Sequence, residues 1–455
     1  MTFTQIIDAL SGWVWGWPMI VLLVGTHVFL TVRLRVPQRR LLTGIRLSVQ
    51  RDKGATGDVS QFGALATSLA ATIGTGNIIG VATAVALGGP GAVLWCWITG
   101  VFGIATKYGE GLLAVKYRRR TSDGRMLGGP MYALETGLGQ KWLAVLFALF
   151  TAVAAFGIGN TVQANAISAN VTQLLDGWVD GRYAQVGTGL FVAVFIGLVV
   201  IGGVRSIARI CTALVPLMAV FYVLGCLYIL CMNWAYIGDA VRLICGEAFS
   251  LRATLGGTAG TALMMGARYG IARGLFSNES GMGSAPIVAA AARTRNPVRQ
   301  ALVSSTGTFW DTVVICAITG LVVVSSMVAN PDVGMSDGAM LTRKAFGMIP
   351  VVGTPILTFG ILTFALSTIL GWSYYGERAV EYLAGRRFIK WYRIVWVVLC
   401  FAGSVMSLDV VWNIADIMNA LMAVPNLISL LLLSGVLARE TDYYLWGNRL
   451  DEEAD

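Results

Sequence analysis

Long apolar segments recur along almost the whole of this 455-residue chain. A helix that crosses the roughly 30 Å hydrocarbon core of a bilayer needs about 20 mostly apolar residues. Segments of this kind, separated by charged clusters or Gly/Pro turns, lie at 13–32, 60–87, 90–115, 141–170, 186–203, 208–232, 255–290, 300–328, 351–376, 391–407 and 410–437. With 56% hydrophobic and 13% charged residues, the chain has more apolar surface than one soluble core can bury. We therefore predict an all-α integral membrane protein of about eleven transmembrane helices.

Basic residues gather in every second loop between the apolar segments. Examples are Arg118–Arg120 after the third segment, Arg205 after the fifth and Arg293 after the seventh. Because cytoplasmic loops are enriched in Lys and Arg, the alternation predicts an outside N-terminus and a cytoplasmic C-terminus. The same clusters account for the net charge of +9, so we expect no binding of nucleic acid.

Two apolar segments contain glycine-rich interruptions. The first, IGTGNI at 73–78, falls in the middle of the predicted membrane, where each glycine weakens a helix by about 1 kcal/mol relative to alanine. The second, from Arg268 to Gly283, lies five spans further along the chain. Matched breaks predict a five-plus-five inverted repeat, with residues 58–232 and 233–437 as its halves. Residues 1–57 then form an extra helix with a basic loop, and 438–455 a cytoplasmic tail.

The first interruption has the chemistry of a binding site. Free N–H groups near Thr75 to Asn77 suit a carboxylate, and free carbonyls near Ala70 and Ile73 suit Na⁺. Two alternatives are that the glycines only allow close helix packing, or that GTGNIIG is a dinucleotide fingerprint, for which a strand–helix unit is missing. The second, matched interruption favours a binding site.

Several longer strings are similar to one known family. GTGNIIGVATAVALGGPGAVLWCW, ATKYGE, GNTVQANAI, GLFSNESGMGSAP, FALSTILGWSYYGE and NALMAVPNLISL resemble the alanine or glycine:cation symporter family, and the resemblance covers about residues 58 to 445. This family is a branch of the amino acid-polyamine-organocation superfamily with the leucine-transporter fold. The resemblance implies sodium-coupled uptake of alanine or glycine by alternating access across the bacterial inner (plasma) membrane. A proton-coupled symporter, or a carrier of serine or glutamine, is the alternative.

The resemblance also implies which residues bind the cargo and the ion. Substrate contacts are expected from Thr75, Gly76, Asn77, Gln163, Phe276, Ser277 and Trp372. Sodium ligands are expected from Ala70, Ile73, Phe364, Ser367 and Thr368. The bulk of Trp372 and Phe276 would leave room for only a small side chain. The plainer alternatives are a bilayer-facing tryptophan, and hydroxyls that bond only to their own helix.

Charged residues inside apolar segments should face the protein interior, because an unpaired charge costs about 2.5 to 3.5 kcal/mol there. We expect a scaffold role for Glu279, Asp311, Asp409 and Asp416. The alternative, proton coupling, would use Asp311 or Glu279.

Three further polar residues lie in predicted spans. Lys107 and Glu110 are three apart on one helix face and predict an anchoring pair. His27, the only histidine, is expected at the interface or in packing, remote from the site.

Other function classes lack their motifs. The chain has no HExxH, no diphosphate-binding Asp cluster and no nucleophile elbow with a histidine, which argues against an enzyme. The cysteines show no metal-ligand spacing; Cys231 and Cys245 flank one outer loop, the one place where we consider a disulfide. A channel would use repeated filter loops rather than two unlike broken helices. We expect no organic cofactor and no obligate protein partner, only the amino acid, Na⁺ and the bilayer.

Overall fold

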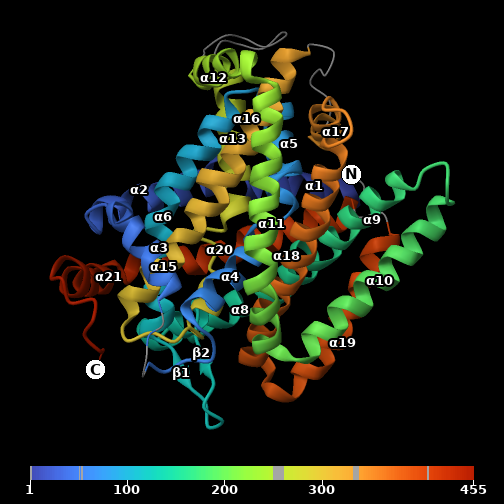
Figure 1. Cartoon of the computed structure of the whole chain (residues 1–455). Coiled ribbons are helices and arrows are strands. Elements are labelled where there is room, and N and C mark those ends of the chain that lie inside the picture. Colours follow the sequence, from blue (N-terminus) through green and yellow to red (C-terminus); the bar gives the residue numbers. More distant parts are fainter. Residues whose placement is uncertain are drawn as a thin grey trace.

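The computed structural model describes residues 3–50, 52, 55–249, 261–330, 338–406 and 409–454, and almost every described segment is helical (Figure 1). The elements of the first half are α1 (Phe3–Val14), α2 (Trp17–Arg33), η1 (Pro37–Arg40), α3 (Leu41–Val49), α4 (Gln61–Thr72), η2 (Thr75–Asn77), α5 (Ile79–Gly88), α6 (Ala92–Lys116), β1 (Arg119–Arg120), β2 (Met126–Leu127), α7 (Pro130–Tyr132), η3 (Ala133–Gly137), α8 (Lys141–Phe156), η4 (Gly157–Thr161), α9 (Val162–Leu174), α10 (Gly181–Ile201) and α11 (Gly203–Met232).

The second half has the same character. Its elements are α12 (Trp234–Ala248), α13 (Thr261–Asn278), α14 (Pro286–Ala289), α15 (Pro297–Thr308), η5 (Phe309–Cys316), α16 (Ala317–Ala329), α17 (Gly338–Gly347), α18 (Gly353–Ala384), η7 (Arg386–Phe388), α19 (Ile389–Val405), α20 (Asp409–Leu432), α21 (Ser434–Glu440) and η8 (Thr441–Trp446).

The predicted fold class, an all-α membrane protein, is confirmed. Within the described part of the chain, eight helical stretches are long and apolar enough to cross a membrane, and the short apolar helix α5 adds to them. Each predicted apolar segment is mainly helical where it is described, apart from the breaks inside 60–87 and 255–290 and short turns near segment ends. The total of eleven spans remains a prediction. The three predicted spans outside these eight are the two broken ones and α6, which is 25 residues long.

The loops divide between the two ends of the bundle as their basic residues predicted. The β1–β2 hairpin and the turns that join α10 to α11 and α18 to α19 lie at one end (Figure 1). The helices α12 and α17, which were not predicted, lie at the opposite end (Figure 1). Cys231 and Cys245 are both free thiols, so the disulfide that we considered is absent.

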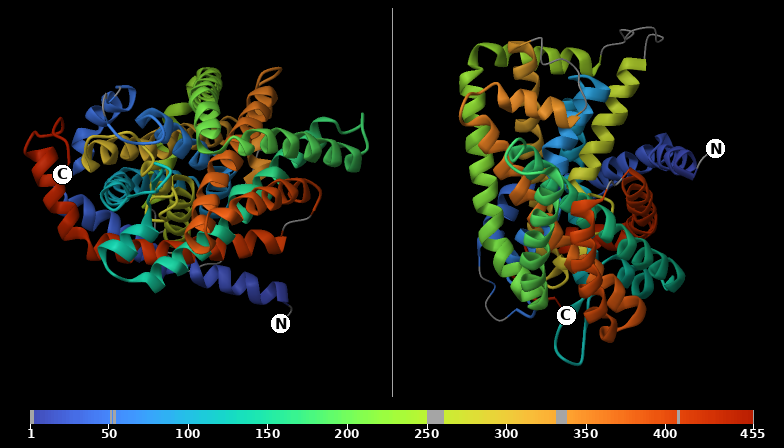
Figure 2. Two further views of the ribbon diagram at one scale, coloured as in Figure 1. Left: turned by 90° about the horizontal axis from the view of Figure 1, so that it is seen from below. Right: turned by 90° about the vertical axis from the view of Figure 1, so that its right-hand side faces the viewer.

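The N-terminal and C-terminal segments pack on the outside of the bundle, as the views in Figure 2 show. α2 contacts α6, and α1 contacts α20. The chain beyond residue 438 continues as η8, and Trp446 donates its indole N–H to the carbonyl of Leu34 at 3.2 Å. Arg299 binds Asp451 at 2.6 Å. The segment predicted as a tail is therefore docked against the bundle.

The second interruption begins later than we predicted. α13 is a continuous helix through Arg268 and Gly274 as far as Asn278, so the predicted start at Arg268 is wrong. Gly270 serves close packing instead: a Cβ there would lie 2.3 Å from the carbonyl oxygen of Ala92 on α6. Small residues allow membrane helices to approach in this way, and sequence alone does not separate that use from a break.

Candidate functional site

The first helix break lies where the sequence predicted it. α4 ends at Thr72, Ile73 leaves the helical conformation with ψ 87°, and α5 resumes at Ile79 after the short turn η2. The side-chain oxygen of Asn77 accepts the Gly74 N–H at 2.9 Å. An asparagine side chain thus replaces a backbone bond that the interrupted helix cannot make.

The second break covers the residues between Asn278 and Pro286. Glu279, Gly281 and Gly283 all have positive φ values, of 53°, 91° and 85°, a backbone region that favours glycine. The freed N–H groups of Gly281 and Gly283 both donate to one carboxylate oxygen of Glu110, each at 3.0 Å. Asn426 donates to the same oxygen at 2.7 Å. The Glu110 carboxylate from α6 therefore fixes the shape of this loop. Its oxygen binds the loop N–H groups as a bound anion does in a concave group of backbone N–H donors.

Asp311 joins the two halves of the site. It is fully buried in η5 and accepts hydrogen bonds from Asn77 at 2.7 Å, from Ser277 at 2.9 Å and from Thr312 at 2.7 Å. Asn77 belongs to the first break, and Ser277 stands at the end of α13, directly before the second. The sequence signal for this role was an acid in an apolar segment, but its partners could not be read from it.

Gln163 contacts the first break from a third span. Its side-chain oxygen accepts the hydroxyl of Thr75 at 3.1 Å, and its amide nitrogen donates to the carbonyl of Ile158 at 3.0 Å. Ile158 lies in the π-helix η4, a local widening that is frequent at functional sites. The predicted substrate residues Thr75 and Gln163 therefore meet in the structure.

Trp372 faces the protein interior beside the same π-helix. Its side chain is 1% exposed, so the bilayer-facing alternative is wrong. A Cβ at Gly159 would lie 2.2 Å from the Cβ of Trp372, which shows how closely α18 approaches η4. The Tyr375 ring packs edge-on against the indole at 5.6 Å.

Phe276 lies against the first break. A Cβ at Gly76 would sit 3.3 Å from the Phe276 ring, and the guanidinium of Arg273 stacks on the ring at 5.8 Å. Glu279 accepts the hydroxyl of Ser284 in the loop before α14, a contact within the second break. The seven predicted substrate residues therefore line one region around the two breaks.

The predicted sodium ligands include a cluster of uncharged oxygens between α4 and α18. The Thr368 hydroxyl lies 3.4 Å from the carbonyl oxygen of Ile73 and 2.9 Å from that of Phe364. The Ser367 hydroxyl bonds to the Phe364 carbonyl at 2.9 Å. Ala70 is buried one helical turn before Ile73. Hydroxyl and carbonyl oxygens suit a hard cation. Thr368 reaches Ile73, directly after α4, as well as its own helix, whereas the Ser367 hydroxyl bonds to its own helix, as the alternative expected.

A buried charged pair stands behind the second break. The Lys107 ammonium lies 3.9 Å from Glu110, and the two side chains are 3% and 0% exposed, which confirms the predicted pair. His27 is buried and shares a 2.7 Å hydrogen bond with Thr106. Packing, not an interfacial position, is therefore its role. The expectation that it is remote from the site is wrong, because a Cβ at Gly281 in the second break would lie 3.7 Å from the His27 ring.

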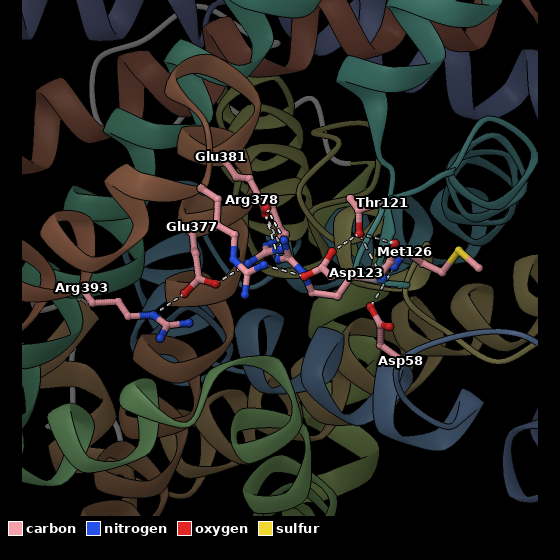
Figure 3. A network of polar contacts seen from close by, with 10 residues as sticks. Asp58, Thr121, Asp123, Met126, Glu377, Arg378, Glu381 and Arg393 are labelled. Carbon is pink, nitrogen blue, oxygen red and sulfur yellow. Dashed lines mark hydrogen bonds and ion pairs between the residues drawn. The ribbon is translucent and has the colours of Figure 1, made fainter.

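A network of ion pairs ties the hairpin to two other segments (Figure 3). Arg125 binds Glu381 near the end of α18 at 2.8 Å, and Asp123 binds Arg386 at 2.7 Å. The backbone N–H of Met126 donates to Asp58, just before the first broken helix, at 3.0 Å. The loop after α6 is therefore attached to both helices that carry the candidate sodium ligands.

The hairpin contacts are expected to be insensitive to pH between 5 and 8. Hydrogen bonds from Thr121 and Arg125 lower the pKa of Asp123 to about 2. A depressed folded-state pKa means that the contribution is present above the unfolded value of about 3.9 and is lost only as pH falls towards 2. Hydrogen–deuterium exchange of residues 119–127, corrected for intrinsic rates, should show equal protection at pH 5 and pH 8; a loss at pH 5 would contradict this.

The chain is similar to known transporters over almost its whole length. The model of the sodium:alanine symporter family matches residues 1–454. The sodium/alanine symporter AgcS of Methanococcus maripaludis is 50% identical over 449 residues, 97% of each chain. The probable sodium/glutamine symporter GlnT of Bacillus subtilis is 34% identical over 95% of this chain and 88% of its own. The crystal structure of MhsT in complex with L-phenylalanine has the same fold, with a TM-score of 0.60 at 16% identity over 87% of this chain and 95% of that one.

Proposed function

This chain belongs to the sodium:alanine symporter family, and we propose that it takes up alanine, glycine or a comparably small neutral amino acid together with Na⁺ by alternating access. It is a multi-pass membrane transporter rather than an enzyme. The observation that carries the proposal is the first break, where the interrupted backbone between Gly74 and Ile78 lies next to a cluster of uncharged oxygens. The N–H groups of Gly74 and Thr75 are held there by side-chain oxygens of Asn77 and Gln163 rather than by a helix. One carboxylate and one cation fit that single locus.

The proposed roles follow the geometry. Thr75, Gly76 and Asn77 hold the substrate carboxylate, and Gln163 orients Thr75. The oxygens of Ile73, Phe364, Ser367 and Thr368, with Ala70, bind Na⁺. No titratable group belongs to this oxygen cluster, which favours Na⁺ over a proton as the coupling ion. Phe276 and Trp372 limit the volume for the substrate side chain.

Uptake into proteoliposomes tests the proposal. Radiolabelled alanine and glycine are supplied with an inward Na⁺ gradient, with choline in its place, and with a proton gradient without Na⁺. Accumulation only with the Na⁺ gradient supports the proposal. Accumulation driven by protons alone would overturn Na⁺ coupling and transfer the role to Asp311 or Glu279. If glutamine is accumulated instead, the cargo assignment is wrong and the GlnT-like alternative is correct.

Removal of both candidate sodium hydroxyls should weaken the Na⁺ dependence. For Ser367→Ala with Thr368→Ala we expect the Na⁺ concentration for half-maximal uptake to rise about tenfold or more, which corresponds to about 1.4 kcal/mol. Thr363→Ala is the matched control, because the Thr363 hydroxyl bonds to its own helix at Phe359. An unchanged Na⁺ requirement in the double variant would exclude these hydroxyls as ligands.

Truncation of Trp372 should broaden the cargo. Trp372→Ala removes a buried ring beside the site, so we expect measurable uptake of valine or leucine together with poorer uptake of glycine. Trp391→Ala, which alters a tryptophan that is 65% exposed, controls for the loss of an indole elsewhere. Competition of unlabelled amino acids against labelled alanine measures the change. Wild-type selectivity at equal protein levels would show that Trp372 does not limit side-chain size.

A further inference from the structure

A cavity of about 990 Å³ lies away from the transport site, at the end of the bundle that carries the hairpin. Its walls come from the end of α10, the start of α11, the last turns of α18 and the first turns of α19. Arg125 of the hairpin and Asp58, which accepts the Met126 N–H, also line it. The cavity therefore sits where the basic loops predict the membrane–cytoplasm boundary.

The lining carries more positive than negative charge. Six cationic side chains face two acidic ones among the lining residues. Four of the six, Arg125, Arg378, Arg386 and Arg393, are engaged in ion pairs with Asp123, Glu377 and Glu381. Arg205 and Lys390 are exposed and form no ion pair with any residue that the structure describes. The rim thus offers two cations that lack a protein counter-ion.

One wall of the same cavity is apolar and open to the outside of the bundle. Ile201 at the end of α10 is 73% exposed, and Ile394 and Val398 on α19 are 46% and 59% exposed. α10 and α19 lie side by side at the edge of the molecule (Figures 1 and 2). In a membrane protein such faces contact acyl chains, so the cavity combines a cationic rim with a lipid-facing wall.

We propose that this cavity binds the headgroup of an anionic phospholipid, with its phosphate between Arg205 and Lys390 and its acyl chains along α10 and α19. Arg393, which also lines the cavity, already donates to Glu377 at 2.7 Å and to the carbonyl of Ile201 at 3.2 Å. The phosphate therefore uses Arg205 and Lys390, and these two bonds of Arg393 are kept. Basic pockets between helices on the cytoplasmic side recognise anionic headgroups through this combination. A free phosphate ion would use the two cations but not the apolar wall.

Spin-labelled lipids measure this binding without any reference to transport. The protein is reconstituted in phosphatidylcholine, and the motionally restricted fraction is compared for phosphatidylglycerol and phosphatidylcholine labelled in the acyl chain. Wild-type protein should restrict phosphatidylglycerol preferentially. Arg205→Gln and Lys390→Gln should each lower its relative association constant about fivefold, corresponding to about 1 kcal/mol per basic residue at the membrane surface.

Matched variants keep the test specific. Arg387 is an exposed cation in the turn between α18 and α19, and it does not line the cavity. Arg387→Gln should therefore leave the preference for phosphatidylglycerol unchanged. Arg205→Lys should retain most of it, which separates loss of charge from misfolding. Added glycerol 1-phosphate should not displace the labelled lipid; displacement at millimolar concentration would overturn the proposal in favour of a soluble phosphate site. Equal preference in the Arg205→Gln/Lys390→Gln double variant and in wild-type protein would overturn it as well.

Discussion

Asp311→Asn is expected to reduce alanine uptake about a hundredfold at normal protein levels in the membrane. The Asp311 carboxylate accepts three hydrogen bonds, from Asn77, Ser277 and Thr312. An asparagine keeps one acceptor oxygen and turns a donor towards the remaining partners. Hydrogen bonds to a charged group contribute about 1.5 to 3 kcal/mol each, so weakening two of them removes about 3 kcal/mol from the link between the helix breaks.

Thr312→Val is the matched comparison for this variant. It removes one donor to Asp311 but preserves the charge and both bonds to the breaks, so we expect at most about a tenfold loss. Initial rates of labelled alanine uptake, normalised to protein in the proteoliposomes, distinguish the two. Equal losses in both variants would mean that the connection between Asn77 and Ser277 has no part in transport.

Glu110→Gln is expected to lower the stability of the protein by about 3 to 5 kcal/mol. The substitution leaves the Lys107 ammonium buried without a counter-ion, and removing one partner of a buried ion pair has a cost of this size. The Glu110 oxygen that accepts from Gly281, Gly283 and Asn426 also loses its charge. The thermal unfolding midpoint in detergent should therefore fall markedly.

Lys107→Met separates the charge from the loop contacts. The Glu110 carboxylate keeps its three donors in this variant, so we expect a smaller loss of stability than in Glu110→Gln. The double variant, Lys107→Met with Glu110→Gln, contains neither charge of this pair and should unfold at a higher temperature than Glu110→Gln alone, a coupling that only interacting residues show. Strictly additive effects would contradict a direct pairing of the two side chains.

The fold class could be predicted because a helix that contacts lipid must consist mostly of apolar residues, and this is visible in the sequence. Apolar runs of about 20 residues, alternating basic loops and a glycine-rich break at 73–78 are local properties, and each was found in the structure. The length of the second break could not be predicted from local sequence. Glycines 270 and 274 looked like part of it, but they sit in a continuous helix where α13 packs on α6.

In the candidate site, too, some features could be predicted from local sequence and others depend on packing. A Ser-Thr pair and a tryptophan in one span could be assigned roles only by resemblance, since sequence does not say which face of a membrane helix meets protein and which meets lipid. The orientation of Trp372 against Gly159, and the reach of Thr368 to Ile73, depend on how α18 packs on η4 and α4.

By itself the sequence determined that the chain is a bundle of membrane helices with a broken helix near residue 75, because hydrophobicity and helix propensity act within about twenty residues. The tertiary structure alone decided that Asp311 links the two breaks and that Glu110 shapes the second. It also brought the hairpin to the ends of α4 and α18. These contacts join residues far apart in the sequence: Ser277 and Asp311 are 34 positions apart, Asp58 and Met126 are 68, and Asn77 and Asp311 are 234. Only packing of the whole bundle brings such partners together.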